Sequence, residues 1–139
     1  MGAMKRRMLI VDDEPHILAL VSYRLQAFGF EVSMAMDGQE ALVKVFQDPP
    51  DLIILDVMMP LMNGFEVCAR LKRDDRTRRI PIVLFTAKAQ DKDYAEGMAC
   101  GADAYLTKPF DAKDLHQIIT HLSSALSSDR SAEPTGDHA

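Results

Sequence analysis

The chain lacks the long apolar runs that insert proteins into membranes or direct them out of the cell. No apolar stretch among its 139 residues approaches the roughly 20 residues that a membrane-spanning helix needs. The opening residues, MGAMKRR, are not followed by the long apolar segment and cleavage site of a secretory signal peptide. We therefore expect a cytoplasmic protein with no membrane insertion.

An excess of basic residues is also missing. The chain has 16 lysines and arginines against 21 aspartates and glutamates, with a formal net charge of −5 and a pI near 5.3. Broad surfaces for nucleic acids or anionic membranes need the opposite balance, so we expect no direct nucleic-acid binding through this domain. One basic cluster is more typical of a solvated helix end than of a docking site. It comprises Arg70, Lys72, Arg73, Arg76, Arg78 and Arg79.

Cysteine is scarce. The two cysteines, Cys68 and Cys100, fall in predicted helices and form no CxxC or Cys/His pattern. In a cytoplasmic protein such residues are more often free thiols than a disulfide or metal ligands. We expect two free, partly buried thiols, and we assign no role to the four histidines, which share no ligand spacing.

A continuous apolar run, LIILDVMMP at positions 52–60, is the most informative feature that the chain does have. Residues 52–55 and Val57 are apolar without alternation, which is typical of a strand that helices cover on both faces. Asp56 ends this strand, and open α/β sheets bind ligands beyond the carboxyl ends of their strands. Asp56 is therefore the first candidate site residue.

Short apolar runs alternate with segments of helical periodicity along the whole chain. The runs cover 8–11, 31–35, 52–56, 80–85 and 104–107; the helical segments cover 15–28, 38–46, 65–73, 91–100 and 112–126. Five such repeats predict an α/β fold, a doubly wound parallel five-stranded sheet with helices on both faces. We expect one domain over 5–126 and a disordered tail over 127–139. The buried face of the second helix should carry Ala41, Leu42, Val45 and Phe46.

Polar side chains follow four of these strands, and parallel strands bring them to one edge of the sheet. They are Asp12 and Asp13, Asp56, Thr86, and Lys108. Three converging carboxylates repel each other unless a hard cation such as Mg²⁺ lies between them. A metal and a lysine beside an aspartate would bring a phosphoryl donor to that nucleophile, and the threonine hydroxyl could donate to a phosphoryl oxygen.

In these features the chain resembles the receiver domain of two-component response regulators, over about 6–126. Each motif alone is a weak signal, but the set in this order and spacing is specific. The motifs are Val11-Asp12-Asp13-Glu14, Leu55-Asp56-Val57-Met58-Met59-Pro60 with Asn63-Gly64, Phe85-Thr86-Ala87, Gly101-Ala102-Asp103-Ala104-Tyr105 and Thr107-Lys108-Pro109-Phe110.

The resemblance implies the flavodoxin-like strand order 2-1-3-4-5 and a phosphorylation switch. It makes Asp56 the phosphoacceptor, with Thr86 and Lys108 as catalytic residues for phosphorylation and dephosphorylation of the domain itself, and with no enzymatic turnover of other substrates. It makes Thr86 and Tyr105 the switch pair. The implied partners are a sensor histidine kinase or histidine phosphotransfer protein and a downstream protein effector. The implied Mg²⁺ ligands are Asp12, Asp13, Asp56 and the backbone carbonyl of Met58.

Simpler interpretations exist for each residue taken alone. Asp12 and Asp13 could cap a helix, and Tyr105 could be a half-buried strand aromatic. Thr86 could be an ordinary strand-end hydroxyl, and Lys108 a turn lysine. The ordered set makes these interpretations the weaker ones for the acids, the threonine and the lysine, whereas only the resemblance assigns a role to Tyr105.

Three rival functions use the same fold or chemistry. A haloacid dehalogenase-type phosphatase also has an aspartate nucleophile, but it needs a second Asp two residues later, where this chain has Met58. A phosphorylation-independent interaction module usually lacks one of the site residues, and none is lost here. A flavin-binding module is disfavoured, because the acidic loop after the first strand would repel phosphate.

Overall fold

The computed structural model describes residues 6–86, 95, 99–108 and 111–122, which fall into two compact units described separately. The described part of the first unit ends at residue 108. Its elements are β1 (Arg7–Val11), α1 (Pro15–Ala27), β2 (Glu31–Ala35), α2 (Gly38–Gln47), β3 (Leu52–Asp56), α3 (Gly64–Arg73), β4 (Ile82–Thr86) and β5 (Ala104–Thr107).

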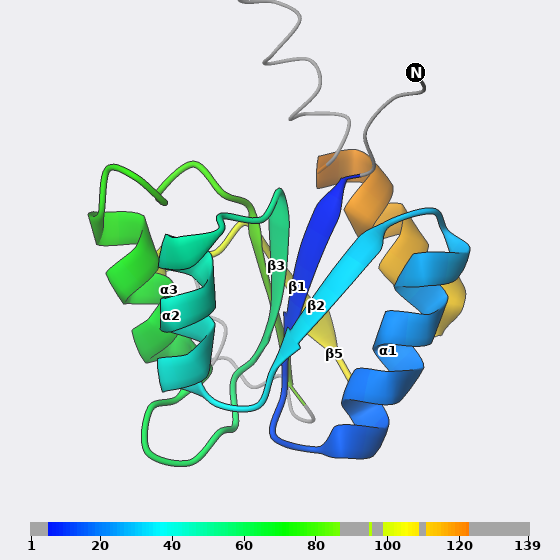
Figure 1. Cartoon of the computed structure of the whole chain (residues 1–139), viewed down its shortest axis with the longest axis horizontal. Coiled ribbons are helices and arrows are strands. Elements are labelled where there is room, and N and C mark those ends of the chain that lie inside the picture. The colour runs from blue at the N-terminus through cyan, green and yellow to red at the C-terminus, as the bar shows by residue number, and fades with distance from the viewer. Residues whose placement is uncertain (1–5, 87–94, 96–98, 109–110, 123–139) are drawn as a thin grey trace, which may run out of the picture. The chain divides into compact units, whose positions relative to one another are not determined.

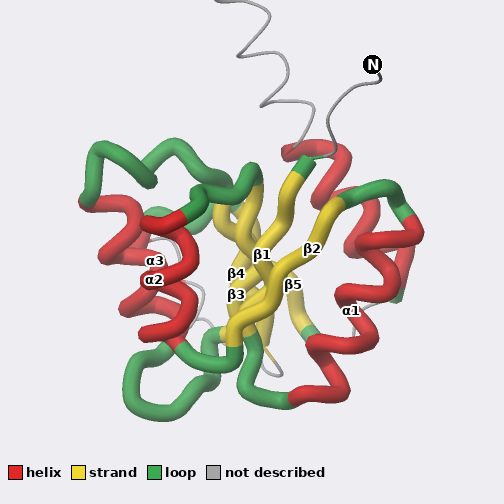
Figure 2. Tube along the Cα trace, in the orientation of Figure 1, coloured by secondary structure: helices red, strands yellow, loops and turns green. Residues whose placement is uncertain are grey.

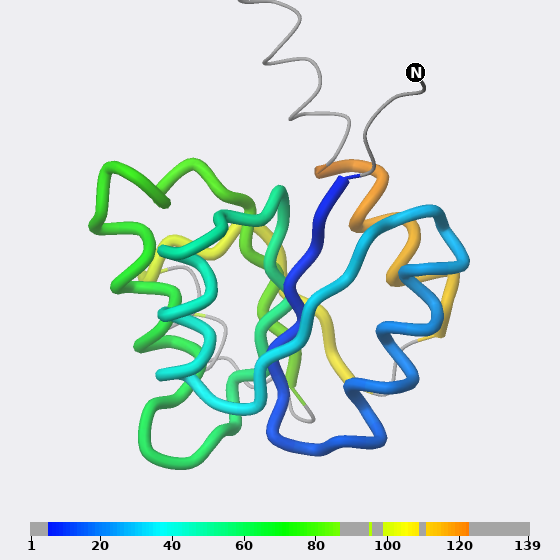
Figure 3. The backbone as a smooth tube through the Cα atoms, in the orientation of Figure 1, coloured from blue at the N-terminus to red at the C-terminus, as the bar shows by residue number. Residues whose placement is uncertain are grey.

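These strands form one parallel sheet in the order β2-β1-β3-β4-β5 (Figure 2). After α1 and again after α2, the chain returns to the same end of the sheet before the next strand begins (Figure 3). Helix α1 covers one face of the sheet, and α2 and α3 cover the other (Figure 1). The predicted doubly wound fold and its 2-1-3-4-5 order are confirmed.

The central strands β3 and β4 are apolar because both of their faces are covered. Every residue of each strand is buried. Strand β2 lies at the edge, where Ala35 is its one buried residue. The continuous apolar sequence of β3 and the more polar EVSMA of β2 follow from this difference in cover.

Local sequence signals set the helix starts. Pro15 lies in the first turn of α1, where a missing N–H leaves no bond unmade. Asp37 caps α2 by accepting a hydrogen bond from the Glu40 amide at 2.8 Å. Asn63 caps α3 in the same way, accepting from the Glu66 amide at 3.0 Å.

Two details of the sequence prediction are wrong. Strand β4 begins at Ile82 rather than at residue 80, because the Ile80 amide donates to Thr77 in a turn and Pro81 has no amide to donate. Phe46 is not buried on α2 but 38% exposed. The guanidinium of Arg76 lies 4.7 Å from the centre of the Phe46 ring. Helical periodicity cannot predict this cation–π contact.

The described part of the second unit is residues 111–122, of which 112–122 are helical. Asp111 caps this helix, because its Oδ1 accepts from the Asp114 amide at 2.9 Å. Leu115 and Ile119, one turn apart, are its buried side chains. Most of the predicted helix at 91–100 and the predicted tail at 127–139 lie outside the described residues. No helix in the described ranges is both long and apolar enough to cross a membrane.

Candidate functional site

The predicted site residues of the first unit lie at the carboxyl edge of its sheet. Asp12 and Asp13 follow β1 directly, Asp56 ends β3, Thr86 ends β4, and Lys108 follows β5. One carboxylate oxygen from each of the three aspartates lies within 4.8 Å of the others. Three acids from two neighbouring strands therefore converge, as the sequence predicts.

Two of these acids are buried. Asp12 is 0% and Asp56 is 3% exposed, whereas Asp13 is partly open to solvent. Asp12 Oδ1 accepts a hydrogen bond from the Glu14 amide at 2.9 Å, and Asp56 Oδ1 accepts one from the Met58 amide at 3.2 Å. Each buried carboxylate is thus held by the backbone two residues further along the chain.

The Asp12 bond also decides against the helix-cap interpretation of the acidic pair. Helix α1 is preceded by Glu14 as its capping residue, and no side-chain hydrogen bond caps it. Asp12 bonds instead to the amide of Glu14 itself, ahead of the helix. Its carboxylate faces the site rather than the free amides of the first turn.

Lys108 brings positive charge to the acids. Its Nζ lies 3.1 Å from Asp12 Oδ2 and 3.7 Å from Asp56 Oδ1. The same nitrogen lies 4.6 Å from the centre of the Phe85 ring, so the penultimate residue of β4 packs beneath the lysine. Among the residues that the structure describes, Lys108 is the lysine paired with these acids, so one ammonium group faces three carboxylates.

The resulting imbalance shows in the acidity of Asp56. Burial raises the pKa of Asp56 from 3.8 to about 6, and the negative charge of Asp12 adds to this increase. The Lys108 charge and the Met58 amide oppose it without cancelling it. Ionisation of Asp56 is disfavoured beside the negative charge of Asp12, and the site offers several carboxylate oxygens. Both features fit a small divalent cation.

Met58 contributes its backbone to this site. Its side chain is 68% exposed, while its amide is bonded to Asp56. The loop then folds back, and the Gly64 amide donates to the Val57 carbonyl at 3.0 Å. A Cβ at Gly64 would lie only 2.4 Å from the Asp56 carbonyl oxygen. Gly64 therefore allows the start of α3 to lie against the end of β3. The Asn63-Gly64 pair predicts a turn at this position, but it does not predict this close approach of two backbones.

Thr86 and Tyr105 share one face of the sheet but differ in their surroundings. Thr86 is 2% exposed, and its carbonyl accepts from the Lys108 amide at 2.7 Å. Thr86 pairs in register with Thr107, two residues after Tyr105. Side chains alternate along a strand, so Thr86, Thr107 and Tyr105 point to the same side. Tyr105 is half-buried and packs against the core that includes α2 and α3 residues.

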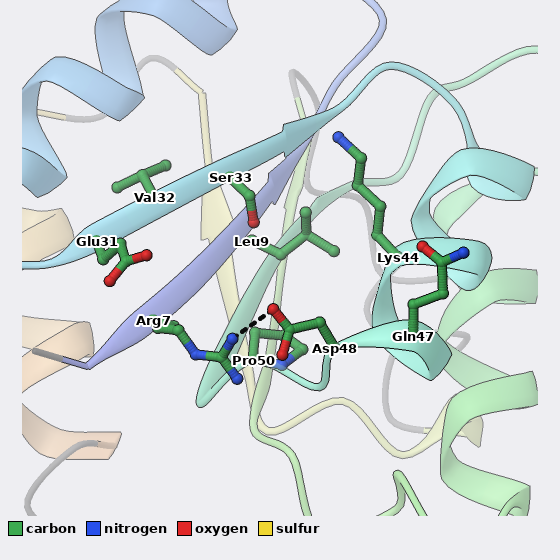
Figure 4. Close-up of a pocket in the computed structure, with 9 residues that line it drawn as sticks. All are labelled: Arg7, Leu9, Glu31, Val32, Ser33, Lys44, Gln47, Asp48 and Pro50. Atoms are coloured by element: carbon green, nitrogen blue, oxygen red, sulfur yellow. Dashed lines mark ion pairs between the residues drawn. The ribbon is translucent and has the colours of Figure 1, made fainter. Parts of the chain in front are cut away.

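A separate pocket lies at the opposite end of β1 (Figure 4). An ion pair of 2.6 Å joins Arg7 to Asp48 across it. Its volume of about 180 Å³ is below the ~300 Å³ of typical ligand sites, and none of the carboxyl-edge residues lines it. The pocket is lined by Arg7, Leu9, Glu31, Val32, Ser33, Lys44, Gln47, Asp48 and Pro50.

The fold and the acidic edge together define an α/β protein of the doubly wound class with a site for cation and phosphoryl chemistry. Residues 8–120 match the family described as the response regulator receiver domain, and the chain belongs to that family. The domain is thus a phosphoacceptor signalling switch of two-component systems.

Relatives with known names agree with this assignment. The chain is 48% identical over 109 residues to the DNA-binding dual master transcriptional regulator RpaA of Synechocystis, covering 78% of this chain and 45% of that protein. It is 42% identical over 116 residues to the alkaline phosphatase synthesis transcriptional regulatory protein PhoP of Bacillus subtilis, covering 84% and 48%. The chain therefore spans less than half the length of these two relatives.

Solved structures match along nearly their whole length. The chemotaxis protein CheY4 of Vibrio cholerae aligns with a TM-score of 0.82 at 36% identity, covering 86% of this chain and 99% of that one. The receiver domain of the sensor histidine kinase PA1611 of Pseudomonas aeruginosa aligns with a TM-score of 0.80 at 26% identity, covering 86% and 98%. That structure is described as having a magnesium ion coordinated in its active-site cleft.

Proposed function

We propose that the chain accepts a phosphoryl group on Asp56 and changes its binding to a partner as a result. The observation that carries this proposal is the arrangement around one carboxylate. Asp56 is buried at the end of β3, lies 3.7 Å from the Lys108 ammonium, and forms a cluster within 4.8 Å with Asp12 and Asp13. Among the described residues this is the group of acids placed to hold a metal ion.

The site residues fit Mg²⁺, which prefers oxygen ligands and keeps several of its waters. Asp12, Asp13 and Asp56 would hold the ion together with the Met58 carbonyl, in the loop that the Met58 amide fixes to Asp56. The bound ion would neutralise the acids and the oxygens of the incoming phosphoryl group.

The nucleophile in this proposal is the ionised Asp56 carboxylate. One of its oxygens forms a bond to phosphorus while the P–N bond of a phosphohistidine donor breaks. The departing imidazole nitrogen takes the electron pair of that bond. Lys108 stabilises the charge on the phosphoryl oxygens, and the Thr86 hydroxyl donates to one of them. Dephosphorylation is a separate step, in which a water oxygen bonds to phosphorus, the bond from phosphorus to the Asp56 oxygen breaks, and inorganic phosphate leaves the regenerated carboxylate. Catalysis is thereby confined to the domain's own modification.

Thr86 and Tyr105 form the proposed switch. If Thr86 turns toward the phosphoryl group, it leaves space on the face that it shares with Tyr105. A population shift of the half-buried Tyr105 ring into that space would then change the surface around β5. Phosphorylation at one strand end would thereby reach a partner-binding surface.

The proposed partners and extent follow the family. A sensor histidine kinase or histidine phosphotransfer protein would supply the phosphoryl group, and a downstream protein effector would receive the signal. We place the receiver domain at 5–126, around the family match at 8–120, in a cytoplasmic setting. DNA binding is a property named for relatives such as RpaA, and the net charge of −5 makes it an unsuitable role for this domain.

The rival functions have less support. At the position of the second acid of a haloacid dehalogenase-type phosphatase, the chain has Met58 with a largely exposed thioether side chain. A phosphorylation-independent module has no need of a lysine held 3.7 Å from a buried acid. Membership of the receiver-domain family disfavours the phosphatase, and the complete set of site residues disfavours the phosphorylation-independent module.

The test is labelling by acetyl phosphate with and without Mg²⁺, followed by mass spectrometry of the intact chain and its peptides. We expect one phosphoryl group per chain, located on Asp56, and loss of the label in the presence of EDTA. Asp56→Asn should stay unlabelled, whereas Asp75→Asn, which changes an exposed acid, should label as the wild type does. Equal labelling of Asp56→Asn would exclude Asp56 as the acceptor.

A further inference from the structure

The two cysteines of the chain meet although 32 positions separate them. Cys68 lies in the middle of α3, and Cys100 comes shortly before β5. The Cys68 thiol donates to the backbone oxygen of Cys100 with a sulfur-to-oxygen distance of 3.5 Å. Cys100 also packs against the apolar cluster that contains Cys68. This places them where a disulfide bond could close by movement of side chains rather than of whole elements.

A neighbouring network holds these two segments together. Lys72, one helical turn after Cys68, donates from Nζ to Asp103 Oδ2 at 2.9 Å and to the Ile80 carbonyl at 2.8 Å. The same Asp103 oxygen accepts from the Ile82 amide at 2.8 Å. The residues after Cys100 are thus fixed to both α3 and β4.

The two thiols differ in solvent access and in acidity. Cys68 is 0% exposed, whereas Cys100 is partly exposed. The side-chain contact with Cys68 lowers the pKa of Cys100, and the nearby Lys72 charge lowers it further. The same contact and burial raise the pKa of Cys68. Cys100 is therefore the thiol that ionises and meets a dissolved oxidant, and Cys68 is the protected thiol beside it.

We propose that Cys68 and Cys100 are a peroxide-sensitive pair that closes reversibly into a disulfide. The Cys100 thiolate attacks a peroxide oxygen, the O–O bond breaks, and hydroxide leaves as Cys100 becomes a sulfenic acid. The Cys68 sulfur then bonds to the Cys100 sulfur, and the sulfenic oxygen leaves as water with the proton of the Cys68 thiol. The two thiols lose two electrons to hydrogen peroxide, and a dithiol reductant returns them.

The bond would tie α3 to the segment that leads into β5. It would close a loop across a separation of 32 positions, which restricts the unfolded chain more than the folded one. The oxidised domain should therefore melt about 5 °C or more above the reduced domain. Because the chain has two cysteines in all, an intramolecular disulfide can join no other pair.

The experiment treats the reduced full chain with hydrogen peroxide and follows intact mass, free thiols and migration on a non-reducing gel. We expect both thiols to be lost together, a mass lower by two hydrogens, a monomeric band, and full reversal by dithiothreitol. In Cys68→Ala, Cys100 should accumulate as a sulfenic acid that dimedone traps. In Cys100→Ser, the buried Cys68 should stay reduced at the same peroxide dose.

Other outcomes would overturn the proposal. One is loss of thiols through disulfides between two chains. Another is oxidation of Cys100 beyond the sulfenic acid at the same rate in the wild type and in Cys68→Ala, because a working partner thiol should intercept that intermediate. Circular dichroism establishes whether both variants are folded. If Cys68→Ala does not fold because its position is buried, Cys100→Ser, which changes a partly exposed position, still tests the proposal.

Discussion

The ammonium of Lys108 reaches across the ends of β4 and β3 to the carboxylate of Asp12, 3.1 Å away. The two residues are 96 positions apart and follow strands that are not neighbours in the sheet. Asp12 is fully buried, so the lysine compensates a charge that water cannot reach. The same Nζ atom lies 3.7 Å from Asp56 Oδ1, which keeps a positive charge beside the proposed nucleophile.

Replacing Lys108 by methionine should slow phosphorylation strongly without preventing metal binding. The variant keeps much of the side-chain volume over Phe85 but removes the donor to the phosphoryl oxygens. Removal of one such donor costs about 100-fold in rate in comparable sites. The measurement is the initial rate of acetyl phosphate labelling at saturating Mg²⁺. Lys113→Met removes an exposed lysine as a control, and an equal rate in both variants would rule out a role for Lys108.

Much of this site can be predicted from sequence, because it depends on topology. Once alternating β and α segments define a parallel sheet, residues that follow its strands must share an edge, and this brings Asp12, Asp56 and Lys108 together. Closer contacts depend on packing that no local pattern records. The Phe85 ring beneath the lysine and the missing Cβ of Gly64 against β3 are examples.

The same limit applies to the details of the fold. Phe46 follows the periodicity of a buried position, yet it is 38% exposed and packs against Arg76 from a different part of the chain. The two cysteines look unrelated in sequence, and they are free thiols as predicted, but their mutual contact arises from tertiary structure. The periodicity of a sequence predicts which face of its helix or strand a residue occupies. The residue that it contacts there depends on elements distant in the chain.

Asp56→Asn should stabilise the metal-free protein at neutral pH. Burial and Asp12 raise the folded-state pKa of Asp56 from 3.8 to about 6, so ionisation of this group favours the unfolded state. The penalty is absent below pH 3.8, grows as the pH rises through about 6, and is complete at pH 7. Removing it should add about 1–3 kcal/mol at pH 7 and progressively less toward pH 4.

Urea denaturation in EDTA at several pH values provides the measurement for this stability prediction. Asp75→Asn is the matched control, because its carboxylate is 87% exposed and lies outside the site. The prediction fails if Asp56→Asn is less stable than the wild type at pH 7. It also fails if the advantage of the variant increases as the pH is lowered.

Gly64→Ala should destabilise the domain more than Gly29→Ala. The added methyl group at Gly64 would lie 2.4 Å from the Asp56 carbonyl oxygen, so the start of α3 must move. Gly29 has a φ of +97° but no atom within 4 Å of an added Cβ, so its substitution costs about 1–2 kcal/mol through backbone strain alone. We expect about 2–4 kcal/mol for Gly64→Ala, together with slower labelling of Asp56. Equal losses of stability in denaturant titrations would contradict the close approach.

The last prediction concerns the lifetime of the phosphorylated state and depends on Met58. Its side chain is 68% exposed, two residues after Asp56, and its amide bonds to the Asp56 carboxylate. We expect the thioether to lie at the mouth through which water must approach phosphorus. Methionine is a weak hydrogen-bond acceptor and shields the site, whereas an asparagine amide could position the attacking water. Lys88, a second candidate for this shielding, lies outside the described residues.

We therefore expect the phosphoryl group to be lost several-fold faster from Met58→Asn than from the wild type. Met58→Leu, which keeps an apolar side chain of similar size, should decay at the wild-type rate. Both rates are measured on protein labelled with acetyl phosphate and then freed of the donor, so that labelling and decay are separated. If the leucine and asparagine variants decay equally fast, the effect reflects disturbance of the loop. If the asparagine variant decays at the wild-type rate or more slowly, Met58 does not shield the phosphoryl group.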